Sequence, residues 1–208
     1  MKKFELTSEF TLSIFGVKLF QIKALVSFAN VNAGELGGFI ETEDNLSQEG
    51  NAWVSGDAEV YGNARVSGNA RVYGNARVSG DAEVYGDAEV YGNARVYGDA
   101  EVYGNARVSG NARVYGNAWV YGDAEVKKVT HLFQLGMIGS RSDFTTFFRA
   151  KSNQIHVVCG CFLGSIGDFE KAVEKTHAGT KHERTYKLAI QLAKEQIELE
   201  AEVEEAEI

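Results

Sequence analysis

Residues 50–67 read Gly-Asn-Ala-Trp-Val-Ser-Gly-Asp-Ala-Glu-Val-Tyr-Gly-Asn-Ala-Arg-Val-Ser, and this six-residue phrase continues to Lys127 without insertion or deletion. The stretch 50–127 holds thirteen copies of Gly-(Asn/Asp)-Ala-x-Val-(Tyr/Ser), the last of which ends in lysine. A six-residue period indicates a parallel β-solenoid rather than a globular sheet. Alanine and valine lie two residues apart, so they share one face and predict an Ala–Val interior. Gly and the following Asn or Asp accept positive φ, which predicts the corners there.

Three strands and three corners make a triangular coil of eighteen residues, so the repeats form a little over four coils. The repeat resembles that of left-handed β-helix hexapeptide proteins, in which an aliphatic residue is followed four places later by a small one. Val54 and Ala58 begin this series, and Val120 and Ala124 end it. The resemblance implies a mainly β fold, a left-handed parallel β-helix of about four to five coils. The spacing alone does not give the handedness.

The x residue faces outward and is coupled to the corner before it. Asp corners are followed by Ala-Glu, and Asn corners by Ala-Arg or, at the two ends, by Ala-Trp. Folding the x positions onto the eighteen-residue coil gives three ladders. They are Trp53, Arg71, Glu89, Arg107, Glu125; then Glu59, Arg77, Arg95, Arg113; and then Arg65, Glu83, Glu101, Trp119. Alternating charges stabilise the first ladder, whereas like charges repel one another in the other two.

The second and third ladders predict a contact between subunits. We expect the arginine ladder of one subunit (Arg77, Arg95 and Arg113) to meet the acidic pair Glu83 and Glu101 of the next. Rotation by a third of a turn closes this heterologous contact into a homotrimer. Left-handed β-helix proteins also usually form trimers. The alternative, that repeat duplication shuffled two cassettes at random, stays open.

Eight tyrosines occupy the other outward position of the repeats. They are Tyr61, Tyr73, Tyr85, Tyr91, Tyr97, Tyr103, Tyr115 and Tyr121. Exposed rings in this number suggest a partner surface or a subunit interface. Stacking along the coils would explain them equally well.

The composition limits the class of protein. A net charge of −8 argues against broad nucleic-acid binding, and part of that charge comes from seven glutamates among the last fourteen residues. The sequence shows neither a signal peptide nor an apolar run of membrane length. Its two cysteines are too close in sequence to bridge easily. These features predict a cytoplasmic protein that binds neither nucleic acid nor membrane.

The segments on either side of the repeats are expected to cap the open ends of the solenoid. Residues 1–49 predict a small N-terminal β cap with two strands around Gly16. Within it, the lead-in 34–50, followed directly by Asn-Ala-Trp-Val, resembles uncharacterised hexapeptide-repeat proteins of bacteria and phages. Those proteins are often labelled transferases on fold analogy alone, and the resemblance implies no assigned chemistry.

Residues 128–208 predict a C-terminal α+β module. We expect a strand over 129–138, a hairpin from 144–150 and 155–162, and a capped helix ending near 177–179. A second helix should run from about His182 into the acidic tail, which is expected to be solvated. Its apolar stripe comprises Tyr186, Ile190, Ala193 and Ile197, widened by Leu188, Leu192, Leu199 and Val203. Motifs such as Cys159-Gly160-Cys161-Phe162 resemble a module of phage-encoded proteins.

The sequence gives little support for an enzymatic activity. Acyl transfer, the usual activity of left-handed β-helix enzymes, needs a histidine base at a subunit cleft, yet the repeats contain no histidine. His131 follows the last coil and is the candidate base, with a structural role as the alternative. Cys159 and Cys161 should alternate onto one strand face, and we interpret them as buried free cysteines rather than zinc ligands or a nucleophile. No metal or cofactor is expected.

Gly139-Ser140-Arg141 follows a predicted strand and could hold an anion through backbone N–H groups, a hydroxyl and a guanidinium. An ordinary turn is the alternative. The candidate ligand-binding residues are Ser140, Arg141, Thr145, Arg149 and His177. The sequence thus predicts a non-catalytic, phage-type trimeric binding protein for a small anionic ligand, such as a nucleotide signal, or for a host protein, with a role in counter-defence. An acyl-CoA-dependent acyltransferase and a structural spacer remain alternatives.

Overall fold

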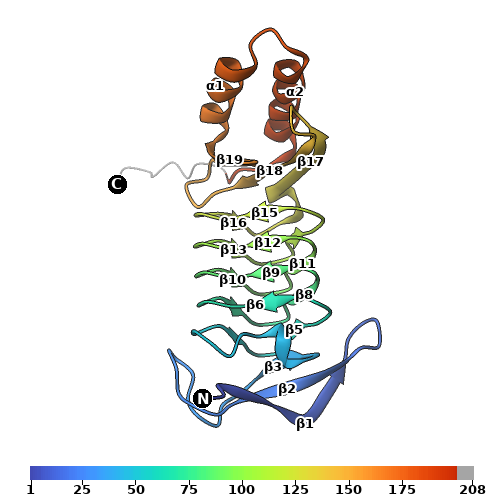
Figure 1. Ribbon diagram of the computed structural model, residues 1–208, viewed down its shortest axis with the longest axis vertical. Coiled ribbons are helices and arrows are strands. Elements are labelled where there is room, and N and C mark those ends of the chain that lie inside the picture. Colours follow the sequence, from blue (N-terminus) through green and yellow to red (C-terminus); the bar gives the residue numbers. More distant parts are fainter. Residues whose placement is uncertain (201–208) are drawn as a thin grey trace, which may run out of the picture.

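A column of stacked β coils forms the middle of the molecule, and Figure 1 shows it between a β hairpin at the base and two helices at the top. The structure is a computed structural model that describes residues 1–200. The column is a parallel β-solenoid of about five coils, as the six-residue period predicts. Each coil contributes one short strand to each of three sheets, so the cross-section is a triangle, and the solenoid strands within each sheet are parallel while β1 and β2 extend the first sheet with antiparallel pairs.

The three sheets take every third strand of the solenoid in turn. The first contains β1 (Phe4–Leu12), β2 (Lys18–Ala24), β3 (Leu36–Ile40), β5 (Glu59–Val60), β8 (Arg77–Gly80), β11 (Arg95–Gly98) and β14 (Arg113–Val114). The second contains β4 (Trp53–Val54), β7 (Arg71–Val72), β10 (Glu89–Val90), β13 (Arg107–Val108) and β16 (Glu125–Val126). The third contains β6 (Arg65–Val66), β9 (Glu83–Val84), β12 (Glu101–Val102) and β15 (Trp119–Val120).

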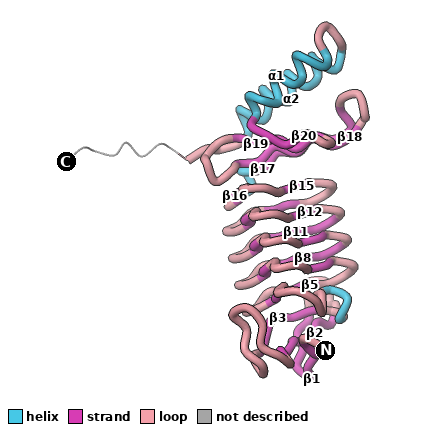
Figure 2. Tube along the Cα trace, turned by 60° about the vertical axis from the view of Figure 1, so that its left-hand side comes forward, coloured by secondary structure: helices cyan, strands magenta, loops and turns pink. Residues whose placement is uncertain are grey.

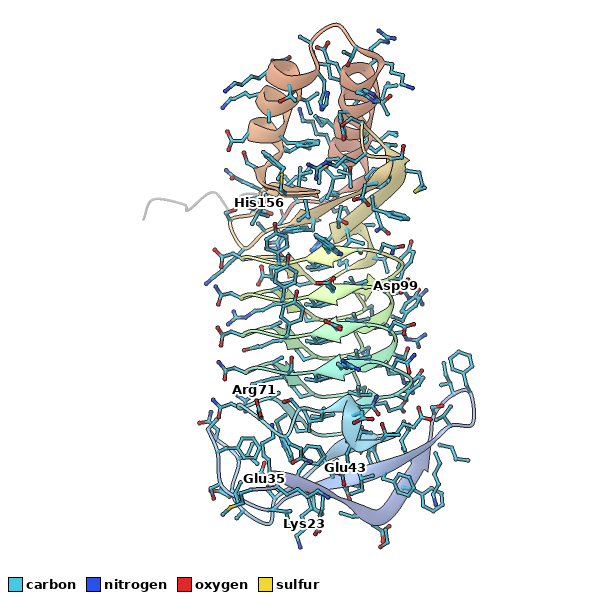
Figure 3. The ribbon with its side chains drawn as sticks, viewed as in Figure 1. Lys23, Glu35, Glu43, Arg71, Asp99 and His156 are labelled. Carbon is cyan, nitrogen blue, oxygen red and sulfur yellow. The ribbon has the colours of Figure 1, made fainter. Side chains whose placement is uncertain are left out.

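The strand register confirms the three predicted ladders, because paired residues in the repeats are eighteen positions apart. Glu89 pairs with Arg107, Arg95 with Arg113, and Glu101 with Trp119. The charged x residues are half-buried or exposed except Glu59, which is buried, and Figure 3 labels Arg71 among them. The Ala and Val of every repeat are buried, which confirms the predicted interior.

The corners differ from the prediction in one respect. Only the glycine of each corner adopts positive φ, and no Asn or Asp of the repeats does so. The Asn and Asp side chains instead hydrogen-bond along the column: the Asn51 amide donates to Asn69, and the Asn69 amide donates to Asp87, at 2.9 Å each. The preference for Asn and Asp therefore reflects a corner ladder rather than left-handed backbone.

The first coil starts before the exact repeat does. Phe39 of β3 pairs in parallel with Glu59, and Leu46 forms a parallel bridge with Val66, each offset by twenty residues. The two additional residues lie between Ser47 and Asn51, because Ser47 donates to Val66, nineteen residues on, whereas Asn51 donates to Gly68 with the regular spacing of seventeen. Trp53, expected to face outward, is buried beneath the cap, where its ring meets those of Phe4 and Phe28 edge-on. The N-terminal cap thus extends the solenoid core as well as covering it.

The two ends of the solenoid need opposite hydrogen-bonding partners. Most bonds between coils run from an N–H group of one coil to a C=O group of the next, whereas the paired valines donate back to the preceding coil, so the first coil lacks partners mainly for C=O groups and the last mainly for N–H groups. At the base, the amide of buried Asn45 donates to Gly62 O and Ala64 O at 2.9 Å each. At the top, Thr146 Oγ1 and His131 Nδ1 each accept a backbone N–H at 3.3 Å. Donors therefore cap one end and acceptors the other.

Lys3 is a second donor at the base and carries a buried charge. Its ammonium donates to the carbonyl of Ala52 at 3.0 Å, with Glu49 O at 3.4 Å and Gly50 O at 3.5 Å. Burial lowers its pKa from 10.5 to about 8. The unfolded chain therefore binds more protons than the folded chain between these pH values, and this contribution to stability rises with pH.

We expect the free energy of unfolding to rise by about 2 kcal/mol from pH 7.5 to pH 9.5, relative to the Lys3→Met variant. Methionine has a similar volume without the charge, so the other titrating groups cancel in the comparison. Guanidinium unfolding of both chains at each pH measures the difference. A pH-independent difference between the chains would show that the Lys3 pKa is not depressed.

The C-terminal module covers the last coil with an antiparallel sheet and two helices. It comprises the 3-10 turn Val129–His131, then β17 (Leu132–Ile138), β18 (Asp143–Arg149), β19 (Ile155–Cys159), β20 (Phe162–Ser165), α1 (Ile166–His177) and α2 (Lys181–Gln196). Phe148 and Val158 pack into the solenoid core, whereas Phe147 and Val157 face the helices. Both faces of the sheet are therefore buried between the solenoid and the helices, as Figure 2 shows from the side.

The helices largely follow the sequence prediction. The Ser165 hydroxyl caps α1 by accepting the N–H of Asp168, and Tyr186, Ile190, Ala193 and Ile197 form the buried stripe of α2. Leu188, Leu192 and Leu199 were expected to widen that stripe but are exposed. Helix α2 ends at Gln196, and both Val203 and most of the acidic tail lie outside the described residues.

The tyrosines form stacks along the coils. The ring pairs Tyr73–Tyr91, Tyr85–Tyr103, Tyr103–Tyr121 and Tyr97–Tyr115 lie 4.5 to 5.5 Å apart and nearly parallel. Tyr73 and Tyr85 also donate to Glu89 and Glu101, the acidic members of neighbouring ladders. Stacking therefore accounts for these tyrosines, of which Tyr97 and Tyr115 leave the largest exposed areas.

Candidate functional site

A pocket of about 290 Å³ lies in the C-terminal module, between the β17–β18 turn, the β19–β20 turn and the two helices. Buried Phe169 and Val173 from α1 give it an apolar wall. Exposed Ser140 and Arg141 from the β17–β18 turn, and half-buried His177 from the end of α1, add polar groups. The pocket therefore combines an apolar interior with a cationic edge, which is a common composition for small-molecule sites.

The β17–β18 turn has an irregular backbone that brings its polar residues to the helices. Met137, Gly139 and Ser142 all have positive φ, and the register of the strand pair shifts between Leu135 and Ile138. A Cβ atom at Gly139 would lie 1.7 Å from the Tyr186 hydroxyl, so only glycine fits there. This close approach fixes the turn, and with it Ser140 and Arg141, against α2.

Arg141 supplies the positive charge of the pocket. Its Nη1 atom lies against the β19–β20 turn, 3.3 Å from the position that a Cβ at Gly160 would occupy. Within residues 1–200 its guanidinium forms no ion pair, although Asp143 also lines the pocket. The guanidinium is thus placed to receive an anionic group from a ligand.

Three polar side chains, those of Thr145, Cys159 and Tyr186, connect the sheet to α2 at the pocket. The Thr145 hydroxyl donates to Cys159 Sγ at 3.3 Å, and Cys159 Sγ lies 3.6 Å from the Tyr186 hydroxyl. Burial, followed by the contact with Cys159, raises the pKa of Tyr186 well above its usual value, although Arg141 acts against this. Tyr186 is therefore a neutral phenol at physiological pH and can donate or accept a hydrogen bond.

The structure brings three of the five predicted ligand-binding residues to one pocket: Ser140, Arg141 and His177. Thr145 is fully buried behind Cys159 and does not line the pocket. Sequence reasoning missed Tyr186, which its spacing assigned to the helix stripe, and the pocket-lining role of both cysteines. The aromatic contact between His177 and Tyr186, with ring centroids 5.6 Å apart, joins the predicted and the missed residues.

Arg149 was predicted to bind the ligand, but the structure places it away from the pocket. Its side chain is 2% exposed and lies at the junction with the solenoid, where Nη1 contacts Glu125 Oε2 at 3.0 Å and Nη2 contacts Glu200 Oε2 at 2.9 Å. Its Nε donates to Asn153 Oδ1 at 3.0 Å. Burial acts to raise the pKa of Glu125, but hydrogen bonds from Arg149 and Lys127 outweigh it and lower the pKa. Arg149 is thus a buried link between the C-terminal module and the last coil.

The two cysteines do not share one strand face. Cys159 ends β19 and is half-buried, whereas Cys161 lies beyond Gly160, which has a φ of +58°, and is exposed. The turn separates them, so the prediction of two buried cysteines is wrong for Cys161. In the described part of the chain, no three His, Cys, Asp or Glu side chains gather as metal ligands would.

His131, the candidate catalytic base, is only 1% exposed and caps the last coil by accepting the Lys127 N–H. Burial, and then the charges of Arg149 and Lys128, lower its pKa. A neutral ring keeps Nδ1 free to accept that hydrogen bond. The structure therefore gives His131 a structural role.

The predicted subunit-interface residues lie on two faces of the solenoid. On the arginine ladder, Arg77 is paired with Glu59 at 3.0 Å, while Arg95 and Arg113 are exposed and form no ion pair within residues 1–200. Glu83 and Glu101 are neighbours on the adjacent face, and Glu101 accepts a hydrogen bond from Tyr85 at 2.8 Å. Like charges are thus neighbours on both faces, as the sequence predicts.

The fold defines this chain as a parallel β-solenoid repeat protein with a capped pocket-bearing end. Its repeats match the family model described as the YdcK beta solenoid repeat at residues 58–72, 70–86, 88–104, 100–112 and 106–122. All five matches fall inside the solenoid, so they bear on its repeats and leave the pocket module unmatched. No curated protein matches this sequence. In the part of the chain that the structure describes, no helix is long and apolar enough to cross a membrane.

Proposed function

We propose that this protein is a non-catalytic binding protein whose C-terminal pocket holds a small organic anion. The observation that carries the proposal is the guanidinium of Arg141 at an apolar pocket, without an acidic partner among the described residues. The Ser140 hydroxyl, the His177 ring and the neutral Tyr186 phenol provide further hydrogen-bonding groups around it. No comparable group of side chains supports acyl transfer, because His131, the candidate base, is buried and caps the last coil.

The pocket favours a ligand with one acidic group and an apolar body. Its volume of about 290 Å³ is at the small end for ligand sites. It offers one arginine, and Asp143 would repel a ligand with several negative charges. Phe162, Phe169 and Val173 instead provide contacts for an aromatic or aliphatic group. An apolar monocarboxylate or monophosphate ester therefore suits the site better than a polyphosphate.

We further propose a ring of three subunits in which the arginine ladder of one meets Glu83 and Glu101 of the next. Each ring would present three copies of the pocket. The phage origin and the counter-defence role remain predictions of the sequence resemblance.

Replacing Arg141 by alanine is expected to weaken binding of small organic acids at least tenfold, because the charge-assisted hydrogen bonds are lost. Thermal shift with a panel of monocarboxylates and monophosphate esters identifies ligands that stabilise the native chain, and titration calorimetry then gives their Kd. Native mass spectrometry of the same samples shows bound mass and subunit number.

The matched control is Arg184→Ala, which removes an exposed arginine of α2 that does not line the pocket. This variant should bind like the native chain. Equal affinities for Arg141→Ala and Arg184→Ala would remove this pocket as the binding site.

A further inference from the structure

Trp119 is an outward repeat residue whose place in the sequence the fold does not explain. Tryptophan stands at the two ends of the repeats, where the other Asn corners are followed by Ala-Arg. Trp53 is buried beneath the N-terminal cap. Trp119 lies in β15, the last strand of the third sheet, and stays 39% exposed beneath the C-terminal module (Figure 1). Packing within the chain therefore accounts for Trp53 but not for Trp119.

A second pocket, of about 190 Å³, lies beside Trp119. Trp119 and Phe144 give it two aromatic groups, and Asp143 adds a carboxylate. The strand that carries Trp119 is held by Thr146, whose hydroxyl accepts the Trp119 N–H at 3.3 Å. The Phe144 ring lies against the backbone of Gly136, where a Cβ atom would come within 2.5 Å of it. Contacts within the chain therefore position both aromatic residues beside the pocket.

The charges beside this pocket are negative. Asp143 forms no ion pair within residues 1–200, and its Oδ1 accepts the N–H of Phe144 at 2.7 Å. Glu101 is the strand neighbour of Trp119 in the coil below. The cation–π contacts of the described chain lie in the N-terminal cap, so neither aromatic ring of the pocket already carries a cation. Arg141 lines the neighbouring anion pocket and does not line this one.

Aromatic groups beside a carboxylate favour a cationic ligand. The face of an aromatic ring is negative, so it attracts an ammonium group, and the attraction grows when water is excluded. An alkylated ammonium suits such a pocket better than a bare one, because its methyl groups also bury apolar surface against the rings. Its charge is balanced by the carboxylate.

We propose that this second pocket binds a small alkylated ammonium group at Trp119 and Phe144, with Asp143 as its counter-charge. The pocket lies on the solenoid side of the C-terminal sheet, whereas the anion pocket lies on the helix side, and both reach Asp143 and Gly160. The inference does not rest on the proposed function, since Arg141 takes no part in it.

Choline and its neutral carbon isostere, in which a tert-butyl group replaces the trimethylammonium group, are the probes. Titration calorimetry of the full-length chain should give a Kd of about 1 mM for choline, the affinity that two cation–π contacts supply. The isostere has the same shape without the charge and should bind at least tenfold more weakly. Tighter binding of choline than of a peptide with one trimethyllysine would assign the site to a free compound, and the reverse to a modified protein; either result supports the alkylammonium site.

Nuclear magnetic resonance of the two indole N–H groups locates the contact. Choline should shift the signal of Trp119, whereas the signal of the buried Trp53 should stay in place. The Trp119→Leu variant identifies which signal is which. A shift of neither signal, or of that of Trp53 alone, would place the bound cation away from this pocket.

Two substitutions and two matched controls complete the test. Trp119→Leu and Asp143→Asn should each weaken choline binding about tenfold. Tyr115→Leu removes an exposed ring of the same coil, and Asp57→Asn removes an exposed carboxylate near the base; neither residue lines the pocket, so both variants should bind like the native chain. Circular dichroism confirms that each chain is folded. The proposal fails if choline does not bind, if the isostere binds equally well, or if the site variants bind like the controls.

Discussion

Replacing Arg149 by methionine is expected to lower the free energy of unfolding by about 3 kcal/mol. The substitution removes a buried guanidinium that contacts Glu125 at 3.0 Å, and it leaves that carboxylate with Lys127, at 3.3 Å, as its ion-pair partner in the described chain. Asn153 also loses the hydrogen bond that it accepts from Arg149. Guanidinium unfolding gives the global change, and hydrogen exchange of residues 123–127 and 143–149 shows whether the junction opens first.

Arg113→Met is the matched control. Arg113 is an exposed arginine of the last coil, to which Glu125 also belongs, and it forms no ion pair in the described chain. A surface substitution of this kind should change stability by about 0.5 kcal/mol or less. If the two methionine variants were equally stable, Arg149 would not link the module to the solenoid. A variant that kept its stability but lost ligand affinity would instead restore the original assignment of Arg149 to the binding site.

Replacing Gly86 by alanine is expected to destabilise the solenoid by about 3 kcal/mol. Two costs combine at this corner. The φ of +71° is unfavourable for any L residue with a side chain, at about 1 kcal/mol, and the new methyl group would lie 2.9 Å from the backbone nitrogen of Gly104 in the next coil. The neighbouring coil is held by hydrogen bonds on both sides, so it cannot move away without loosening them.

Gly122→Ala separates the two costs. Gly122 has the same place in the repeat and a φ of +67°, but it lies in the last coil, where the nearest atom to a new Cβ is Leu163 Cδ2 at 3.9 Å. We expect a loss of about 1 kcal/mol from the backbone alone. Chemical unfolding followed by circular dichroism measures both variants. Equal losses would mean that coil spacing does not limit the residue at the corners.

The solenoid could be predicted almost in full because its contacts repeat with its sequence. An offset of eighteen residues fixes which side chains are neighbours, so the pairing of Arg95 with Arg113 follows from counting. Counting fails at the ends, where the environment is no longer that of a repeat. Trp53 occupies an outward position, yet the N-terminal cap folds over it and buries it.

The candidate site could be predicted only in part. Ser140 and Arg141 were found because a short Gly-Ser-Arg turn carries its anion-binding groups locally. The place of Arg149 at the junction could not be predicted, because a sequence gives an arginine's charge but not its partners, and Glu125 and Glu200 are far from it along the chain. Tyr186 was missed because one side chain serves two roles: its ring packs in the helix stripe while its hydroxyl contacts Cys159.

The number of hexapeptide repeats also sets the height of the C-terminal module along the column and the direction in which its pocket points. One added repeat would turn everything above it by about a third of a revolution, so the pocket would point over a different face of the column. Three added repeats would restore the direction and raise the pocket by about 4.8 Å. Gain or loss of whole repeats can therefore re-aim the C-terminal module in discrete steps, while both caps still meet the same kind of coil edge.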